Sequence, residues 1–269
     1  MKLLIEVWES VKIAAGALAA NKMRAFLTLL GIIVGVTTVI GIVSLTEGLD
    51  KAFGEEISAL GSDMLYVQKF PWMNNMDVDE FRNRKDITME EVEALREYAS
   101  LAKAVSPSVG TTRIVRFLGR SLESVSISGT NHERTSGAWP EQGRDLSAVD
   151  VANRRNVCVI GSDVAEKLFK EKNPLGEKIK ISGYPFRVIG VLEKQGSMFG
   201  NNLDQTVKIP IGVFFKAFGS RRSLTIDVKV KDPSLMEAAK NEIIGILRRV
   251  RNVPPGDEND FAVNQMDII

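Results

Sequence analysis

The feature that most constrains this chain is an uninterrupted apolar stretch near its N-terminus. From Ala25 to Thr46 the sequence AFLTLLGIIVGVTTVIGIVSLT holds 22 residues and no charged side chain. At about 1.5 Å of rise per residue, a helix of this length measures roughly 33 Å, close to the hydrocarbon thickness of a bilayer. A buried helix of a soluble protein usually keeps a polar stripe, and a signal peptide has a shorter apolar core followed by a small-residue cleavage site. The stretch therefore predicts a transmembrane helix.

The charges on either side of the stretch predict its orientation. Four lysine or arginine residues precede it, whereas Glu47 and Asp50 come before the first cation that follows it, Lys51. An excess of Lys and Arg in a short flank favours the cytoplasmic side of a membrane. We therefore expect a single-pass protein of the cell (inner) membrane, with a cytoplasmic N-terminus and the bulk of the chain periplasmic or extracellular.

Two helical segments flank the apolar stretch. In residues 1–22, apolar side chains recur at helical spacing opposite charged ones, which predicts an amphipathic helix on the cytoplasmic membrane face. After the stretch, Leu49, Phe53 and Ile57 follow one another at intervals of four residues, and Gly61 offers a C-terminal cap. Residues 23–60 are therefore expected to form one helix, whose transmembrane part continues as a stalk with a packing stripe of Leu49, Phe53 and Ile57.

Two glycines on the apolar stretch are candidates for helix packing. Gly31 and Gly35 lie one turn apart, so their side of the helix lets a second helix approach closely. The alternative is that both glycines are tolerated by chance in a helix that faces lipid, since glycine is common in such helices.

The region beyond the stalk reads as two similar halves. The first half has a strand at 63–69, a helix that begins with a T-x-x-E capping box at Thr88 and Glu91, and strands at 102–106, 111–118 and 122–128. The second half has an alternating strand at 223–230 and a helix that follows Asp232. Two such halves on one sheet predict a membrane-anchored α+β protein with a ferredoxin-like (split β-α-β) porter subdomain, formed by residues 61–130 and 221–269.

Residues 131–220 are expected to form a small, strand-rich insertion. A polar loop runs from residue 129 to 147, a buried strand follows at NVCVIG, and a hairpin turns at Ser182 and Gly183. The C-terminal stretch NVPPGDENDFAVNQMDII reads as a loop and a mildly apolar segment with no assigned place.

The sequence lacks the motifs of several enzyme classes. It contains no G-x-x-x-x-G-K-[ST] phosphate loop and no G-x-G-x-x-G, and its only histidine, His132, lies in a polar loop. The single cysteine, Cys158, reads as a small buried strand residue, and it excludes an intramolecular disulfide. A net charge of +1 gives no sign of nucleic-acid binding. We therefore expect a protein that is not an enzyme, with no catalytic, metal or cofactor site.

Four blocks of the sequence carry a family resemblance. In order and spacing they resemble the N-terminal half of MacB-type ABC-transporter permeases, which are related to FtsX-type permeases; the blocks are NKMRAFLTLLGIIVGVTTVIGIVSLTEGL, GSDMLYV, GRDLSAVDVANRRNVCVIGSDVAEKLF and NPLGEKIKISGYPFRVIGVLEKQG. The resemblance implies one span and a MacB-like periplasmic core domain. It also implies a homodimer or heterodimer of permeases, an ATP-binding partner subunit, and mechanotransmission, in which ATP-driven closure inside moves the outer domain for export or efflux. A periplasmic adaptor is a further expected partner.

One departure from the family leaves two expectations open. Such permeases continue with a second stalk helix and three more spans, so this chain is expected to be either a piece of a longer permease or a subunit whose partner chain supplies those spans. An alternative function is a membrane-anchored docking or sensing module of FtsX type that regulates a cell-envelope partner. The sequence shows no motif that would identify a transported substrate.

Overall fold

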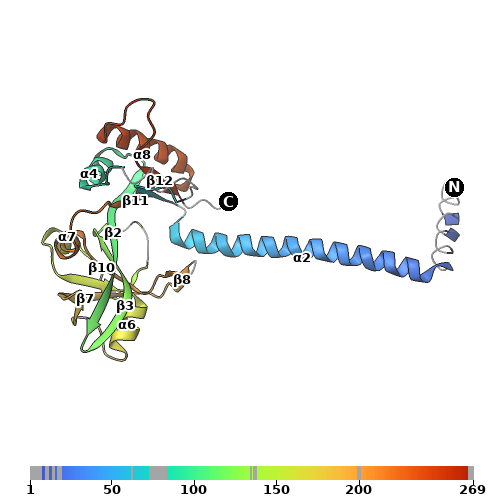
Figure 1. Ribbon diagram of the computed structural model, residues 1–269, viewed down its shortest axis with the longest axis horizontal. Helices are drawn as coiled ribbons and strands as arrows, with labels where there is room; N and C mark the ends of the chain where they lie inside the picture. The colour runs from blue at the N-terminus through green and yellow to red at the C-terminus, as the bar shows by residue number, and fades with distance from the viewer. Residues whose placement is uncertain are drawn as a thin grey trace. The chain divides into compact units, whose positions relative to one another are not determined.

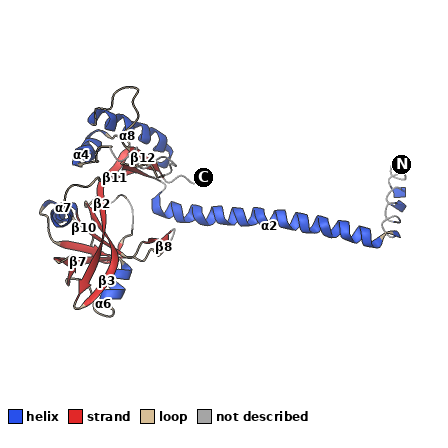
Figure 2. Ribbon diagram, in the orientation of Figure 1, coloured by secondary structure: helices blue, strands red, loops and turns tan. Residues whose placement is uncertain are grey.

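The computed structural model describes residues 8–9, 12–13, 16, 20–61, 63–72, 84–133, 135, 138–198 and 201–265. Two compact units make up the chain, Met1–Ala59 and Leu60–Ile269. The predicted amphipathic helix of residues 1–22 lies largely outside the described residues. The first unit is dominated by one helix, and the second contains the strands, drawn red in Figure 2.

A single helix carries the apolar stretch. Helix α2 (Lys22–Gly61) has 40 residues, so it is about 60 Å long. Its first half is rich in valine, isoleucine and threonine, which are not strong helix formers in water. In an apolar solvent these residues favour a helix nonetheless, because a helix satisfies every backbone hydrogen bond within its own segment. The helix continues without a break to Gly61, as the sequence predicts.

The second unit follows the predicted strand and helix pattern in its first and last parts. Its first elements are β1 (Met64–Gln68), α4 (Met89–Tyr98), β2 (Ala102–Phe117) and β3 (Arg120–Thr130). Its last elements are β11 (Thr225–Val230), the short 3-10 helix η1 (Pro233–Leu235), α8 (Met236–Val250) and β12 (Ala262–Gln265). The capping box at the start of α4 is confirmed, since the Thr88 side chain accepts from the helix backbone and Glu91 reaches back to the Thr88 backbone.

Between these parts lie shorter elements. They are β4 (Pro140–Gly143), α5 (Ala148–Ala152), β5 (Val157–Ile160), α6 (Ser162–Phe169), β6 (Lys178–Ile181), β7 (Tyr184–Leu192), β8 (Ser197–Met198), β9 (Asn201–Asn202), β10 (Thr206–Pro210) and α7 (Ile211–Phe218). Strands β8 and β9 pair only with each other.

The other ten strands form one sheet (Figure 1). Its order is β12-β1-β11-β2-β3-β10-β5-β7-β4, and β6 pairs with both β2 and β7. Strands β2, β3, β10, β5, β7 and β6 therefore form a closed ring of pairings, so that this part of the sheet curls back on itself. Strand β2 belongs to the ring at its C-terminal end and pairs with β11 at its N-terminal end, which joins the two parts of the sheet.

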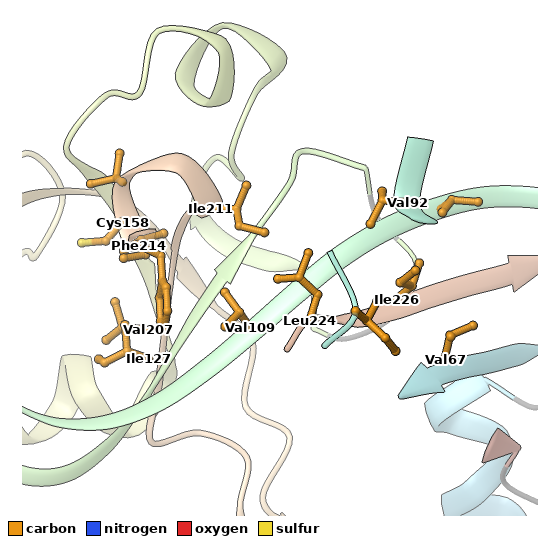
Figure 3. Packing of buried hydrophobic residues seen from close by; sticks show 14 of the residues in the cluster. Val67, Val92, Val109, Ile127, Cys158, Val207, Ile211, Phe214, Leu224 and Ile226 are labelled. Atoms are coloured by element: carbon orange, nitrogen blue, oxygen red, sulfur yellow. The ribbon is translucent and has the colours of Figure 1, made fainter. Parts of the chain in front are cut away.

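A continuous hydrophobic core runs through both parts of the sheet. Figure 3 shows Val67, Val92 and Ile226 at one end, where the core joins the sheet to α4, and Ile127, Cys158 and Val207 at the other, inside the ring of strands. Helix α7 lies against β3, and Phe214 packs directly onto Gly129. A Cβ at position 129 would come within 2.5 Å of the Phe214 side chain, so this close approach requires glycine.

The structure corrects four predictions. The strands expected at 102–106 and 111–118 are one strand, β2, because Pro107 and Gly110 interrupt the pattern of the sequence without interrupting the pairing with β11 and β3. The loop expected at 129–147 contains β4, and the segment 262–265, which had no assigned place, is the edge strand β12 beside β1. Helix α7 was missed, since its run of apolar residues follows directly on a strand.

Candidate functional site

The apolar half of α2 is the first candidate site. Lys22–Gly48 is long and apolar enough to cross a membrane, and none of it is buried within the chain. Three of its threonines, Thr28, Thr38 and Thr46, each donate a hydrogen bond to the backbone carbonyl four residues earlier, at 2.8 to 2.9 Å. These hydroxyls are therefore satisfied within the helix, which makes them compatible with a lipid environment.

Gly31 and Gly35 are open positions in this helix. A Cβ added at either glycine would meet nothing within 4 Å among the residues that the structure describes. No contact with a described residue therefore requires glycine at these two positions. The packing role predicted for them depends on a second helix, and it stays a prediction.

Leu49, Phe53 and Ile57 all lie in α2, at the positions that the stalk prediction requires. Their side chains are outside the part of the structure that is described, so the packing stripe also stays a prediction. The backbone of α2 is continuous from the apolar stretch to these three residues, because all of them lie in the same helix.

The start of the second unit is anchored in the middle of a sheet. The Asp63 carbonyl accepts a hydrogen bond from Val230 N at 2.8 Å, and its carboxylate pairs with Lys229 at 3.3 Å. Strand β1 follows at once and lies between β11 and β12. Because Leu65 of β1 pairs with Gln265 of β12, the chain enters β1 and leaves β12 at the same end of the sheet.

A buried ion cluster joins the start of α4 to the residue that follows α8. The Arg251 side chain, 2% exposed, pairs with Glu91 at the start of α4 and donates to both carboxylate oxygens of Asp260 at 2.7 and 2.8 Å. Its remaining hydrogen bonds go to the carbonyls of Lys85 and Asp86. Burial acts to raise the pKa of Asp260, but the hydrogen bond and the charge of Arg251 outweigh burial and lower it. No local pattern predicts this cluster, because Glu91 and Arg251 are 160 residues apart in the chain.

A second buried carboxylate stabilises the turn before β5. Asp150 is fully buried and accepts from Arg144 at 2.6 Å and from the Ser147 hydroxyl at 2.6 Å. The hydrogen bond from Arg144 is the main reason that the pKa of Asp150 lies well below its usual range, although burial opposes it. Both ion clusters are structural, because their buried members, Asp150, Glu91 and Arg251, bind groups of the protein itself.

His132 and Cys158, the only histidine and the only cysteine of the sequence, lie in different surroundings. The exposed ring of His132 lies beside its neighbour Asn131, with Nδ1 2.9 Å from the amide oxygen. Cys158 is buried in β5, as predicted, and burial raises the pKa of its thiol. Among the residues that the structure describes, no three His, Cys, Asp or Glu side chains form a group suited to a metal ion.

Comparison with known proteins gives one consistent match. The family model described as the MacB-like periplasmic core domain matches residues 25–246. The macrolide export ATP-binding/permease protein MacB of Bdellovibrio bacteriovorus is 30% identical over 255 residues, which cover 93% of this chain and 39% of that protein. The pyoverdine export ATP-binding/permease protein PvdT of Pseudomonas savastanoi is 31% identical over 252 residues, which cover 92% of this chain and 37% of that protein.

A solved structure shares the fold. The periplasmic region of MacB from Actinobacillus actinomycetemcomitans superposes with a TM-score of 0.62 at 21% identity, covering 78% of this chain and 91% of that one. The chain thus spans about two fifths of the length of the curated relatives that it matches, and nearly all of the solved periplasmic region.

Proposed function

Because the chain belongs to the family of MacB-like periplasmic core domains, we propose that it is part of a MacB-type ABC-transporter permease that couples ATP hydrolysis on a partner subunit to movement of an extracytoplasmic domain. The two curated relatives are named for the export of different compounds, a macrolide and pyoverdine, so the family leaves the substrate open. The role of this chain is export or efflux by mechanotransmission. The chain itself contributes no catalytic group.

The observation that carries this proposal is the continuity of α2. One helix of 40 residues runs from the apolar stretch to Gly61, and β1 begins three residues later in the interior of a sheet. A continuous helix is stiff along its axis, because shortening or bending it would break backbone hydrogen bonds. On this proposal a displacement of α2 passes to β1, a strand that has hydrogen-bonded neighbours on both sides.

The second unit is suited to receive such a displacement as a whole. We propose that β1-α4-β2 and β11-α8-β12 form a ferredoxin-like porter subdomain, a proposal supported by the strand order β12-β1-β11-β2 with every neighbouring pair antiparallel. The Arg251 cluster joins its two helices, and β2 continues into the ring of strands. On this proposal residues 131–220 move with the subdomain into which they are inserted.

The proposal includes a topology and partners. The N-terminus is cytoplasmic, the second unit is periplasmic or extracellular, and the chain works beside an ATP-binding subunit and a second permease copy. To test the topology, single cysteines are placed at Glu9 and at exposed Asn201 in a Cys158→Ala background, and intact cells are treated with a membrane-impermeant thiol reagent. Labelling at 201 and not at 9 is expected, and the reverse pattern would reject the orientation.

The coupling is tested by interrupting α2. In the permease reconstituted with its ATP-binding subunit, a spin label at Asn201 is expected to change its spectrum when ATP is added. Inserting Gly-Ser-Gly-Ser after Glu55 should abolish that response, because flexible residues end the helix. The matched control is an alanine-rich insertion of seven residues, about two turns, which keeps the helix continuous and leaves the residues after it on nearly the same side of the helix. An ATP response that survives the flexible insertion would contradict mechanical coupling through α2.

A further inference from the structure

A polar cavity lies on the face of the sheet opposite α4 and α8. Asp227 alternates along β11 with Ile226 and Val228, which belong to the core under those helices, so its side chain points to the other face. Asp227 pairs with Ser106 of β2, and Ser108, two residues further along the same face of β2, pairs with Thr130 of β3, so polar side chains continue across this face. The cavity has a volume of about 270 Å³, and its wall is completed by two groups of residues further along the chain, Asn131, His132, Glu133 and Thr135, and Leu192, Gln195 and Leu203.

Most of the residues that line this cavity carry hydrogen-bonding groups. Of its fourteen lining residues only Leu192 and Leu203 are apolar, and the rest offer hydroxyl, amide, imidazole, carboxyl or ammonium groups. Hydroxyls come from neighbouring strands, with Ser108 on β2 and Ser128 and Thr130 on β3. Such a surface suits a small molecule that is itself rich in hydroxyl groups, because each polar group then regains a hydrogen bond.

One of the ionisable groups that line the cavity is the carboxyl of Asp227. The protein does not fully compensate the cost of removing this carboxylate from water. Burial raises the pKa of Asp227 to about 7, even though a hydrogen bond with Ser108 and the charge of Lys208 both act to lower it. Asp150 and Asp260, the two structural carboxylates, show the opposite result, because each accepts hydrogen bonds from an arginine. A cation placed in the cavity would supply at Asp227 what Arg144 supplies at Asp150.

We propose that this cavity binds a small, hydroxyl-rich molecule that carries a protonated amine, with the amine held at Asp227 and the hydroxyls at Ser108, Ser128 and Thr130. The site joins elements from both sequence halves of the unit, since Asp227 lies on β11 and the hydroxyls lie on β2 and β3. A molecule bound in the cavity would therefore bridge β11, near one end of the sheet, and β3, which belongs to the closed ring of strands. This inference does not depend on the proposed transport function.

The binding test compares two matched probes on the full-length chain in nanodiscs. Glucamine and sorbitol have the same carbon chain and the same hydroxyls except at one terminal carbon, where glucamine carries an amine. Isothermal titration calorimetry should show saturable binding of glucamine and at least about tenfold weaker binding of sorbitol, the loss that one charge-assisted hydrogen bond predicts. Equal binding of the two probes, or no saturable binding of either, would overturn the proposal.

Two variants locate the amine. Asp227→Asn should weaken glucamine binding to the level of sorbitol, whereas Asp257→Asn removes one carboxylate from an exposed loop and should leave glucamine binding unchanged. Unfolding curves of both variants check that they are folded. Unchanged affinity for glucamine in a folded Asp227→Asn protein would place the amine elsewhere and reject the site.

The pH profile of the unaltered protein gives a test that needs no variant. The titratable groups around Asp227 are Tyr66 on β1, Lys208 on β10, and the loop residues His132, Glu133 and Asp145. Because an ammonium pairs with the ionised carboxylate, glucamine affinity should rise as pH increases through about 7 and then level off, and Asp227→Asn should remove this rise. An affinity for glucamine that falls over the same range would contradict the proposed pairing.

Discussion

The two units of this chain differ in whether their apolar side chains are buried within the chain. In the unit from residue 60 to 269, the large apolar side chains of the strands and helices are buried in a core formed by the unit itself. In α2, the apolar side chains from Phe26 to Leu45 are exposed, with Leu27, Ile32 and Val39 each about 60% accessible within the chain. The first unit needs an external apolar solvent or partner, and the second does not. A change in one unit should therefore leave the other unaffected, which each of the following predictions tests.

The largest effect is expected from breaking the buried ion cluster of the second unit. Arg251→Met keeps much of the side-chain volume but leaves the Glu91 and Asp260 carboxylates without their cation, so unfolding free energy should fall by about 3–5 kcal/mol. Chemical denaturation of the chain in detergent measures this loss, and membrane insertion should be unchanged.

The matched control for this cluster is Arg249→Met, an exposed arginine in the same helix. Its effect should stay within about 0.5 kcal/mol. Combining Arg251→Met with Glu91→Gln should recover part of the stability by removing one uncompensated charge. If Arg251→Met and Arg249→Met unfold alike, the cluster does not hold α4 to α8.

The next effect is expected in α2. Val34→Asp places a charge near the middle of Lys22–Gly48, which should disfavour membrane insertion by about 2.5–3.5 kcal/mol. Extraction of membranes at alkaline pH should release the Asp variant and retain Val34→Leu. The second unit of the released protein should unfold at the same denaturant concentration as the parent. Retention of the Asp variant in the membrane would contradict the transmembrane assignment.

Much of this difference between the units was predictable from sequence. The apolar part of α2 was predictable because its length matches the thickness of a bilayer. The capping box at Thr88 and Glu91 is a local sequence pattern, and it is present at the start of α4. The alternation of Ile226 and Val228 with Asp227 assigned a half-buried strand correctly. These features are set by neighbours in the chain, which is why local patterns were sufficient.

What sequence could not supply are the contacts between distant segments. β12 was unassigned because an edge strand of four residues is recognised only by its pairing with β1, and the closed ring depends on β6 meeting both β2 and β7. Nothing in the local sequence distinguishes Arg251 and Asp227 from ordinary surface charges. Only the fold shows that the first is paired and buried and that the second faces a cavity.

A smaller effect is expected from the pH dependence of the second unit. The pKa of Asp227 is raised from 3.8 to about 7 in the fold, so between these values the native state holds a proton that the unfolded chain has released. Stability should therefore fall as pH rises from about 4 to about 7 and level off above that. The loss should be about 1–3 kcal/mol, less than the full shift implies, because the side chain is partly accessible to water.

Asp227→Asn is the variant that isolates the contribution of Asp227 to the pH dependence of stability. It should unfold with a flatter pH profile and should be more stable than the parent at neutral pH. Guanidinium titrations at about five pH values compare the two proteins, and insertion of α2 should not differ between them. An identical pH profile in both proteins would show that Asp227 is solvated and ionised throughout.

The smallest effect on stability, and the sharpest test of the comparison, concerns Gly31 and Gly35. Gly31→Leu with Gly35→Leu keeps α2 apolar and raises its intrinsic helix propensity, so insertion and the unfolding of the second unit should be unchanged. Among the described residues nothing lies within 4 Å of a Cβ placed at either position, so we expect any cost to come from a second helix that approaches the glycines closely. Cysteine crosslinking at Glu47, in a Cys158→Ala background within the assembled permease, should fall at least severalfold in the double variant. A matched Ile32→Leu and Val36→Leu variant, on other positions of the same helix, should crosslink like the parent. Equal crosslinking in all three would mean that the glycines face lipid, and the exposed apolar surface of α2 would then be accounted for by the bilayer alone.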